Sequence, residues 1–85
     1  MITAAQMRAA RALAGIDQKT LAERAGVSLP TIQRMEASDG VVRGVVDTLM
    51  KVIQALDEAG VELIGENHVS ERGGRGVRLK QPASR

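Results

Sequence analysis

The sequence of 85 residues contains no cysteine, no Phe, Tyr or Trp, and a single histidine. Without cysteine, neither a disulfide framework nor a thiolate metal site is available, and His68 alone cannot build a metal centre. Without aromatic rings, the stacking platforms that bind single-stranded nucleic acid, bases or sugars are excluded. No apolar run reaches the roughly 18–20 residues that span a membrane, and no signal-peptide pattern opens the chain. We therefore expect a cytoplasmic protein with no membrane partner, metal or other cofactor.

The short length restricts how the protein is stabilised. A chain of this size forms one small domain and buries only about 60% of the surface that it exposes when unfolded. Its core must be built from Ala, Val, Ile, Leu and Met. Domains this small often depend on disulfides, metals or oligomerisation. Since the first two are excluded, we expect oligomerisation to support the fold.

The net charge of +2 hides an uneven distribution. Residues 1–56 hold seven Lys and Arg against five Asp and Glu. Residues 57–71 hold five acidic side chains and no basic one, and residues 72–85 hold five basic side chains and no acidic one. The two tail blocks cancel, which leaves a mildly basic N-terminal body. Such a body can meet phosphates only if its cations lie on one face.

Four helices are predicted within residues 1–59. Their ranges are 4–14, 18–25, 28–37 and roughly 45–59, with a loop at 38–44. Thr3 and Gln6 form a capping-box pattern, and Asp17 and Ser28 are candidate N-caps for the second and third helices. Pro30 lies in the first turn of the third helix, where its missing N–H has no cost. The side chains expected to face the core are Met7, Ala10, Ala14, Leu21, Ala22, Ala25, Ile32, Met35, Leu49, Val52, Ile53 and Leu56.

The pattern changes after Gly60. Apolar and other residues alternate over 61–64 and 77–80, which predicts two short strands joined by a glycine-rich connection at 65–76. Residues 81–85 read as a flexible tail. The predicted organisation is therefore a helical domain over 1–59, a two-strand appendage over 60–80 and a tail, in a mainly α fold.

Residues 16–36 carry the most information about function. Two short helices flank a turn that contains Gly26, and the small Ala22 allows the helices to approach closely. Leu21, Val27 and Ile32 are placed to lock the pair together. This is the helix-turn-helix layout, in which the second helix enters a DNA major groove. The spacing alone fits a generic helical hairpin equally well.

The residue string favours the first interpretation. It runs Gln18-x-x-Leu21-Ala22-x-x-Ala25-Gly26-Val27-Ser28-x-x-Thr31-Ile32-x-x-x-Glu36. This string resembles the lambda-repressor-like, XRE-type helix-turn-helix family, and the resemblance covers roughly residues 4–58. It implies a lambda-repressor-like bundle of four to five helices that binds double-stranded DNA through its third helix.

The resemblance also implies roles for individual residues. The expected base contacts are Leu29, Pro30, Gln33 and Arg34, and the expected phosphate contacts are Gln18, Ser28, Thr31 and Arg43. Arg34 suits guanine, Gln33 suits adenine, and Gln18 is also expected to brace the recognition helix. Arg11 and Glu36 match a partly buried structural ion pair. The first glycine after Glu36 is delayed to Gly40, which leaves the path of the following loop open.

The expected function is transcription regulation through sequence-specific DNA binding, with repression as the expected mode. One module contacts too few bases for useful specificity, so we expect a homodimer on an inverted repeat. The fourth helix and the tail strands are both candidate dimer surfaces. We favour the tail, because pairing strands between chains would cover the apolar face of a hairpin that is marginal alone.

A second hypothesis is an antitoxin-type interaction module whose tail binds a partner protein. The two functions can coexist in one chain. The sequence contains no Ser/His/Asp or Cys/His set, so we do not expect an enzyme.

Overall fold

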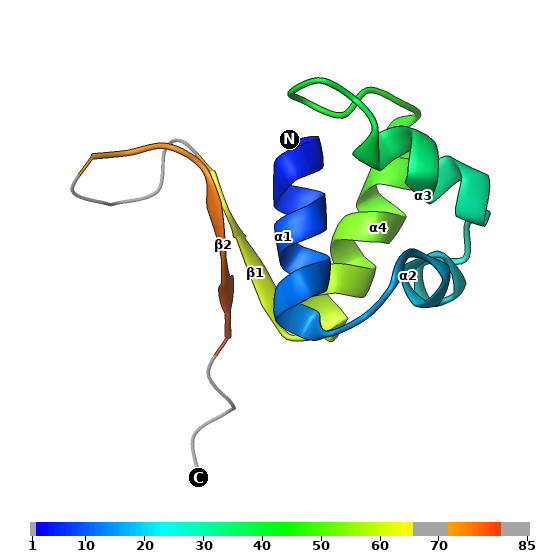
Figure 1. Ribbon diagram of the computed structural model, residues 1–85, viewed down its shortest axis with the longest axis horizontal. Coiled ribbons are helices and arrows are strands. Elements are labelled where there is room, and N and C mark those ends of the chain that lie inside the picture. Colours follow the sequence, from blue (N-terminus) through cyan, green and yellow to red (C-terminus); the bar gives the residue numbers. More distant parts are fainter. Residues whose placement is uncertain (1, 66–71, 81–85) are drawn as a thin grey trace, which may run out of the picture.

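The computed structural model describes residues 2–65 and 72–80, and within them a mainly helical fold. The elements are α1 (Ala4–Ala14), α2 (Gln18–Ala25), α3 (Leu29–Glu36), α4 (Val46–Glu58), β1 (Val61–Ile64) and β2 (Gly76–Leu79) (Figure 1). The predicted fold class, a helix-turn-helix bundle with a short β appendage, is confirmed, with four helices in the described part. The predicted tail at 81–85 and His68 lie outside the described residues.

Local signals set the helix boundaries. The Thr3 hydroxyl accepts the Gln6 N–H at 3.1 Å, and the Gln6 amide oxygen accepts the Thr3 N–H at 2.9 Å, which completes the predicted capping box. Gly15 and Gly26 end α1 and α2 with φ of 70° and 71°, a conformation that favours glycine. α4 begins one residue later than expected, because Val45 is still extended and serves as its N-cap.

The helices enclose a single aliphatic core. The described residues buried in it are Ile2, Ala4, Met7, Ala10, Leu21, Ala22, Ala25, Ile32, Met35, Val42, Leu49, Val52, Ala55, Leu56 and Val61. Most of the predicted inward residues are among them, but Ala14 and Ile53 are only partly buried. Ala55 was not predicted and is buried because α4 packs against α2 and also against β1.

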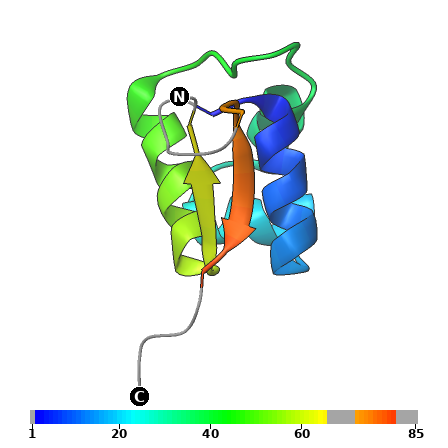
Figure 2. The same ribbon diagram turned by 90° about the vertical axis from the view of Figure 1, so that its left-hand side faces the viewer.

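The two strands pair within the chain as an antiparallel hairpin, with Val61 opposite Leu79 and Ile64 opposite Gly76. β2 therefore runs one residue earlier than the predicted 77–80. The hairpin packs against α1 and α4, with β1 on the side of α4 and β2 on the side of α1 (Figure 2). Val61 is buried, and Leu63 and Val77 pack against the core. The chain's own helices therefore cover these apolar side chains of the hairpin, and the use of the tail as a dimer surface stays a prediction.

A polar clamp holds one end of the hairpin on α1, at the point where β1 ends and β2 begins. The Gln6 side-chain amide donates to the carbonyl oxygens of Ile64 and Gly76, each at 3.0 Å. Gln6 is 5% exposed, so these hydrogen bonds are shielded from water. One buried side chain thus caps α1 and anchors both strands.

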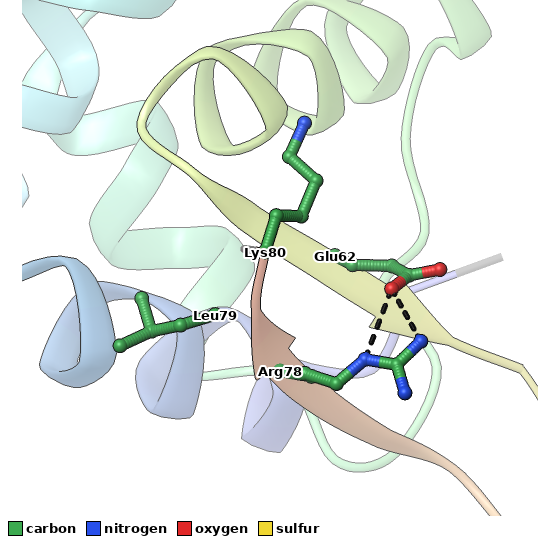
Figure 3. Close-up of a pocket in the computed structure, with 4 residues that line it drawn as sticks. All are labelled: Glu62, Arg78, Leu79 and Lys80. Atoms are coloured by element: carbon green, nitrogen blue, oxygen red, sulfur yellow. Dashed lines mark hydrogen bonds and ion pairs between the residues drawn. The ribbon is translucent and has the colours of Figure 1, made fainter. Parts of the chain in front are cut away.

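Two ion pairs lie on the outer side of the hairpin, beside a surface pocket (Figure 3). Arg78 pairs with Glu62 across the strands at 2.6 Å, and Lys80 reaches Asp57 at the end of α4 at 2.7 Å. Leu79 points away from the Arg78–Glu62 pair and stays half exposed. Exposed ion pairs contribute little free energy, so the apolar contacts and Gln6 are the main attachments of the hairpin.

The hairpin and the α2–α3 pair lie on opposite sides of α1 and α4 (Figure 1). In the part of the chain that the structure describes, no helix is long and apolar enough to cross a membrane.

Candidate nucleic-acid interface

The turn between α2 and α3 is fixed by local hydrogen bonds. The Asp17 carboxylate caps α2 by accepting the Thr20 N–H at 2.7 Å, which lowers the pKa of Asp17 below its usual range. After Gly26, the Val27 N–H donates a hydrogen bond to the Ala22 carbonyl oxygen at 3.0 Å. The Ser28 hydroxyl then accepts the Thr31 N–H at 3.2 Å and caps α3. The relative placement of the two helices is thereby determined.

The third helix presents a polar face to solvent. Ile32 and Met35 are buried in the core, whereas Pro30, Gln33 and Arg34 are exposed. The three exposed residues are spaced i, i+3 and i+4, so they share one side of the helix. A helix with this face uncovered can enter a major groove.

The other predicted contacts near α3 lie at its start, where Ser28 is exposed and Leu29 and Thr31 are partly buried. Leu29 is only partly buried and packs against the core, so a part of its side chain remains at the surface. The hydroxyls of Ser28 and Thr31 are bonded to each other at 2.8 Å, which leaves each oxygen further hydrogen-bonding capacity. Both hydroxyls lie at the N-terminal end of α3, where backbone N–H groups favour an anion.

A buried carboxylate joins the three helices beneath this face. Glu36 is 4% exposed and accepts from Arg11 Nε at 2.6 Å and Arg11 Nη2 at 2.8 Å. The Gln18 amide donates to the same carboxylate at 3.1 Å. The hydrogen bond and charge of Glu36 raise the pKa of Arg11, so the guanidinium stays charged. Gln18 thus braces the end of α3.

The loop after α3 is fastened to the N-terminal segment. The Ala4 N–H donates to Gly40, and the Val42 N–H donates to Ile2, each at 3.0 Å. Val42 is 2% exposed, and Gly40 has a φ of 79°. The delayed glycine therefore makes the turn that docks the loop on residues 2–4.

This path brings Arg43 to α3. A cleft of about 100 Å³ separates α3 from the start of α4. Its lining comprises Thr31, Arg34, Met35, Arg43, Gly44, Val45, Thr48 and Leu49. Three of the predicted DNA contacts, Thr31, Arg34 and Arg43, thus meet at one cleft although they lie on two different elements. Their two guanidinium groups concentrate positive charge there, which suits a polyanion.

Two residues near this surface were not predicted. The Arg8 guanidinium donates to the Glu36 carbonyl at 2.6 Å and so holds the last turn of α3 from α1. Thr48 enters the cleft from α4. In the sequence, both residues look like ordinary surface side chains. Their roles depend on α3, which is distant from Arg8 and from Thr48 along the chain, so no local pattern indicates them.

No three His, Cys, Asp or Glu side chains gather as a metal site in residues 2–65 and 72–80.

Comparison with known proteins agrees with this geometry. Residues 3–63 match the model of a family described as a helix-turn-helix domain. The match spans α1 to α4 and most of β1. None of the curated proteins compared with the chain matches it.

Proposed function

The chain belongs to a family of helix-turn-helix domains, and on this basis we propose that it is an XRE-like, sequence-specific DNA-binding transcription regulator. The observation that carries the proposal is the exposed face of α3. Pro30, Gln33 and Arg34 project from a helix whose start is capped and whose end is held by the buried Glu36. A reading surface must be rigid to discriminate bases, and this one is built on a fixed helix.

The proposed contacts divide into two classes. Gln33 and Arg34 read base edges, with Leu29 and Pro30 supplying apolar contact to the groove. Gln18, Ser28, Thr31 and Arg43 bind phosphates on either side. Repression of an adjacent promoter, by a homodimer on an inverted repeat, is the regulatory mode that we propose.

Selection of duplexes from a random pool, followed by fluorescence anisotropy, tests this function. Arg34→Ala should weaken the selected duplex by about 1–3 kcal/mol and relax the preference at one base pair. Arg43→Ala should weaken all duplexes alike and reduce the salt slope by about 1. Arg78→Ala is the matched control, because it removes the same charge from the hairpin on the other side of the molecule. An unenriched pool, or an equal effect of all three variants, would refute sequence-specific reading by α3.

The antitoxin-type hypothesis stays a prediction. The hairpin lies opposite α3, so a partner protein bound to the hairpin would leave α3 uncovered. This supports the idea that one chain could bind a partner protein and DNA at the same time. Co-purification with the product of a neighbouring gene tests it, and a hairpin variant such as Leu79→Glu should abolish that complex.

A further inference from the structure

The start of α4 carries an apolar surface that the chain itself does not cover. Val45, Val46 and Met50 are 70%, 65% and 53% exposed, and they are the three most exposed large apolar side chains of the described residues. Val46, Met50 and the partly buried Ile53 are spaced i, i+4 and i+7. This outer stripe is separate from the buried stripe of Leu49, Val52 and Leu56. A surface helix ordinarily has a polar outer side, so a second apolar stripe indicates a partner.

We propose that this α4 stripe, consisting of Val45, Val46, Met50 and Ile53, is the surface on which a second copy of the chain docks when the protein binds an inverted repeat. The proposal rests on the proposed function, since it names the contact between the two DNA-bound copies. In a two-fold contact the same patch serves both partners, so each stripe residue can pack near its own counterpart.

The position of the stripe fits two copies on one duplex. Val45 belongs both to the stripe and to the cleft that holds Arg34 and Arg43. Contact between two α4 stripes therefore joins the copies beside their DNA-facing clefts. An inverted repeat requires this, because its half-sites are about 34–36 Å apart and lie on one side of the duplex. The hairpin lies opposite α3 along the 35 Å long axis, so joining hairpins would point the recognition helices away from each other.

The charges beside the stripe also permit an identical partner. Asp47 and Lys51 form an ion pair at 3.5 Å on the exposed side of α4. Because they neutralise each other within one chain, the side of the stripe along Asp47 and Lys51 adds no net charge to the two guanidinium groups of the cleft beside Val45.

The size of the stripe sets the strength of the contact. Three exposed side chains and one partly buried one form a patch on the order of a few hundred Å². A stable interface buries about 800 Å² on each partner. The copies therefore associate weakly in free solution, and the duplex completes the dimer by holding both at once.

Single-cysteine variants test the contact directly, because the chain has no cysteine of its own. Met50→Cys and Leu79→Cys are a matched pair, since the two positions are 53% and 52% exposed. Each is oxidised alone at high concentration and on the selected inverted repeat. Met50→Cys should form a disulfide-linked species of twice the 9.0 kDa chain mass, much faster on the duplex, and Leu79→Cys should not. Faster linkage of Leu79→Cys would assign the dimer to the hairpin, and no linkage of Met50→Cys with two chains on the duplex would overturn the proposal.

A second variant separates this contact from DNA binding itself. Met50→Glu should bind a single half-site like the wild type and lose about 5–150-fold in affinity for the full repeat. Leu79→Glu should change neither affinity. Unchanged binding of Met50→Glu to the full repeat, or equal weakening on the half-site, would refute the α4 contact. If the wild type selects no duplex, the proposed function fails, and linkage of Met50→Cys in free solution then decides the α4 contact separately.

Discussion

The buried ion pair between Arg11 and Glu36 gives the sharpest test of how the recognition helix is held. Arg11→Met removes the charge and the three hydrogen bonds that the guanidinium donates to Glu36 and Ile16, but keeps an apolar stem of similar length. The Glu36 side chain, 2% exposed, then retains the Gln18 amide as its single remaining side-chain donor among those described. A buried carboxylate that has lost its cation is strongly unfavourable. Arg11→Met should therefore destabilise the fold by about 3–5 kcal/mol.

This loss is large for a domain of this size. Total stability at about 0.05–0.15 kcal/mol per residue is on the order of 4–13 kcal/mol for the whole chain. A loss of about 3–5 kcal/mol corresponds to a fall in Tm of roughly 12–40 °C. Because the chain contains no aromatic residue, unfolding in urea is best followed by far-UV circular dichroism.

The chain provides its own control for this experiment. Arg78 and Glu62 pair at the same 2.6 Å, but their side chains are 64% and 39% exposed. Arg78→Met should cost no more than about 1 kcal/mol, because solvent screens an exposed pair. A similar loss of unfolding free energy in Arg11→Met and Arg78→Met would contradict this prediction, because the burial of an ion pair would then not set its contribution to stability.

A double variant identifies the source of the loss. Replacing both members of a buried pair with apolar residues is often close to neutral, because no uncompensated charge remains. Arg11→Met combined with Glu36→Met should therefore recover much of the stability lost in Arg11→Met. A double variant at least as unstable as the single one would show that packing around Arg11, and not the buried carboxylate, causes the loss.

Three further predictions concern the caps. Gln6→Glu keeps the cap acceptor but loses the donor to Ile64 and Gly76, so it should cost about 1–3 kcal/mol and speed hydrogen exchange in β1 and β2. The pKa of Asp17 is lower in the folded chain than its unfolded value of about 3.9, so the ionised carboxylate stabilises the fold above that pH. This contribution is lost as the pH falls below about 3.9 and through the lower folded pKa. Asp17→Asn should therefore flatten this part of the curve of urea unfolding midpoint against pH. Ser28→Ala should cost about 1 kcal/mol by thermal melting. The prediction for Gln6→Glu is contradicted if hydrogen exchange becomes faster over the whole chain and not only in β1 and β2. An unchanged pH profile would contradict the prediction for Asp17→Asn, and an unchanged Tm the prediction for Ser28→Ala.

Much of the fold could be predicted because its signals are local. Thr3 with Gln6, Asp17 and Ser28 each bond a backbone N–H three residues away, and Gly15 and Gly26 adopt a conformation that few other residues accept. Such contacts are encoded within one turn of helix. The helix boundaries and the inward faces follow from them, with errors of about one residue at the ends of α3, at the start of α4 and in β2.

The candidate site was predictable where it depends on helix spacing. The exposure of Gln33 and Arg34 follows from their positions relative to Ile32 and Met35. The grouping of Arg43 with Arg34 does not, because it depends on how the loop docks on residues 2–4.

The sequence by itself determined where the helices begin and end and which residues of α3 face outward, since these follow from neighbours a few residues apart. Only the tertiary structure decided that Gln6 clamps a hairpin 58 and 70 residues away, and that this hairpin lies opposite α3. It also decided that a stripe of α4 remains uncovered. Packing between distant segments selects among many possible partners for an apolar or polar side chain, and no local pattern specifies which partner is chosen.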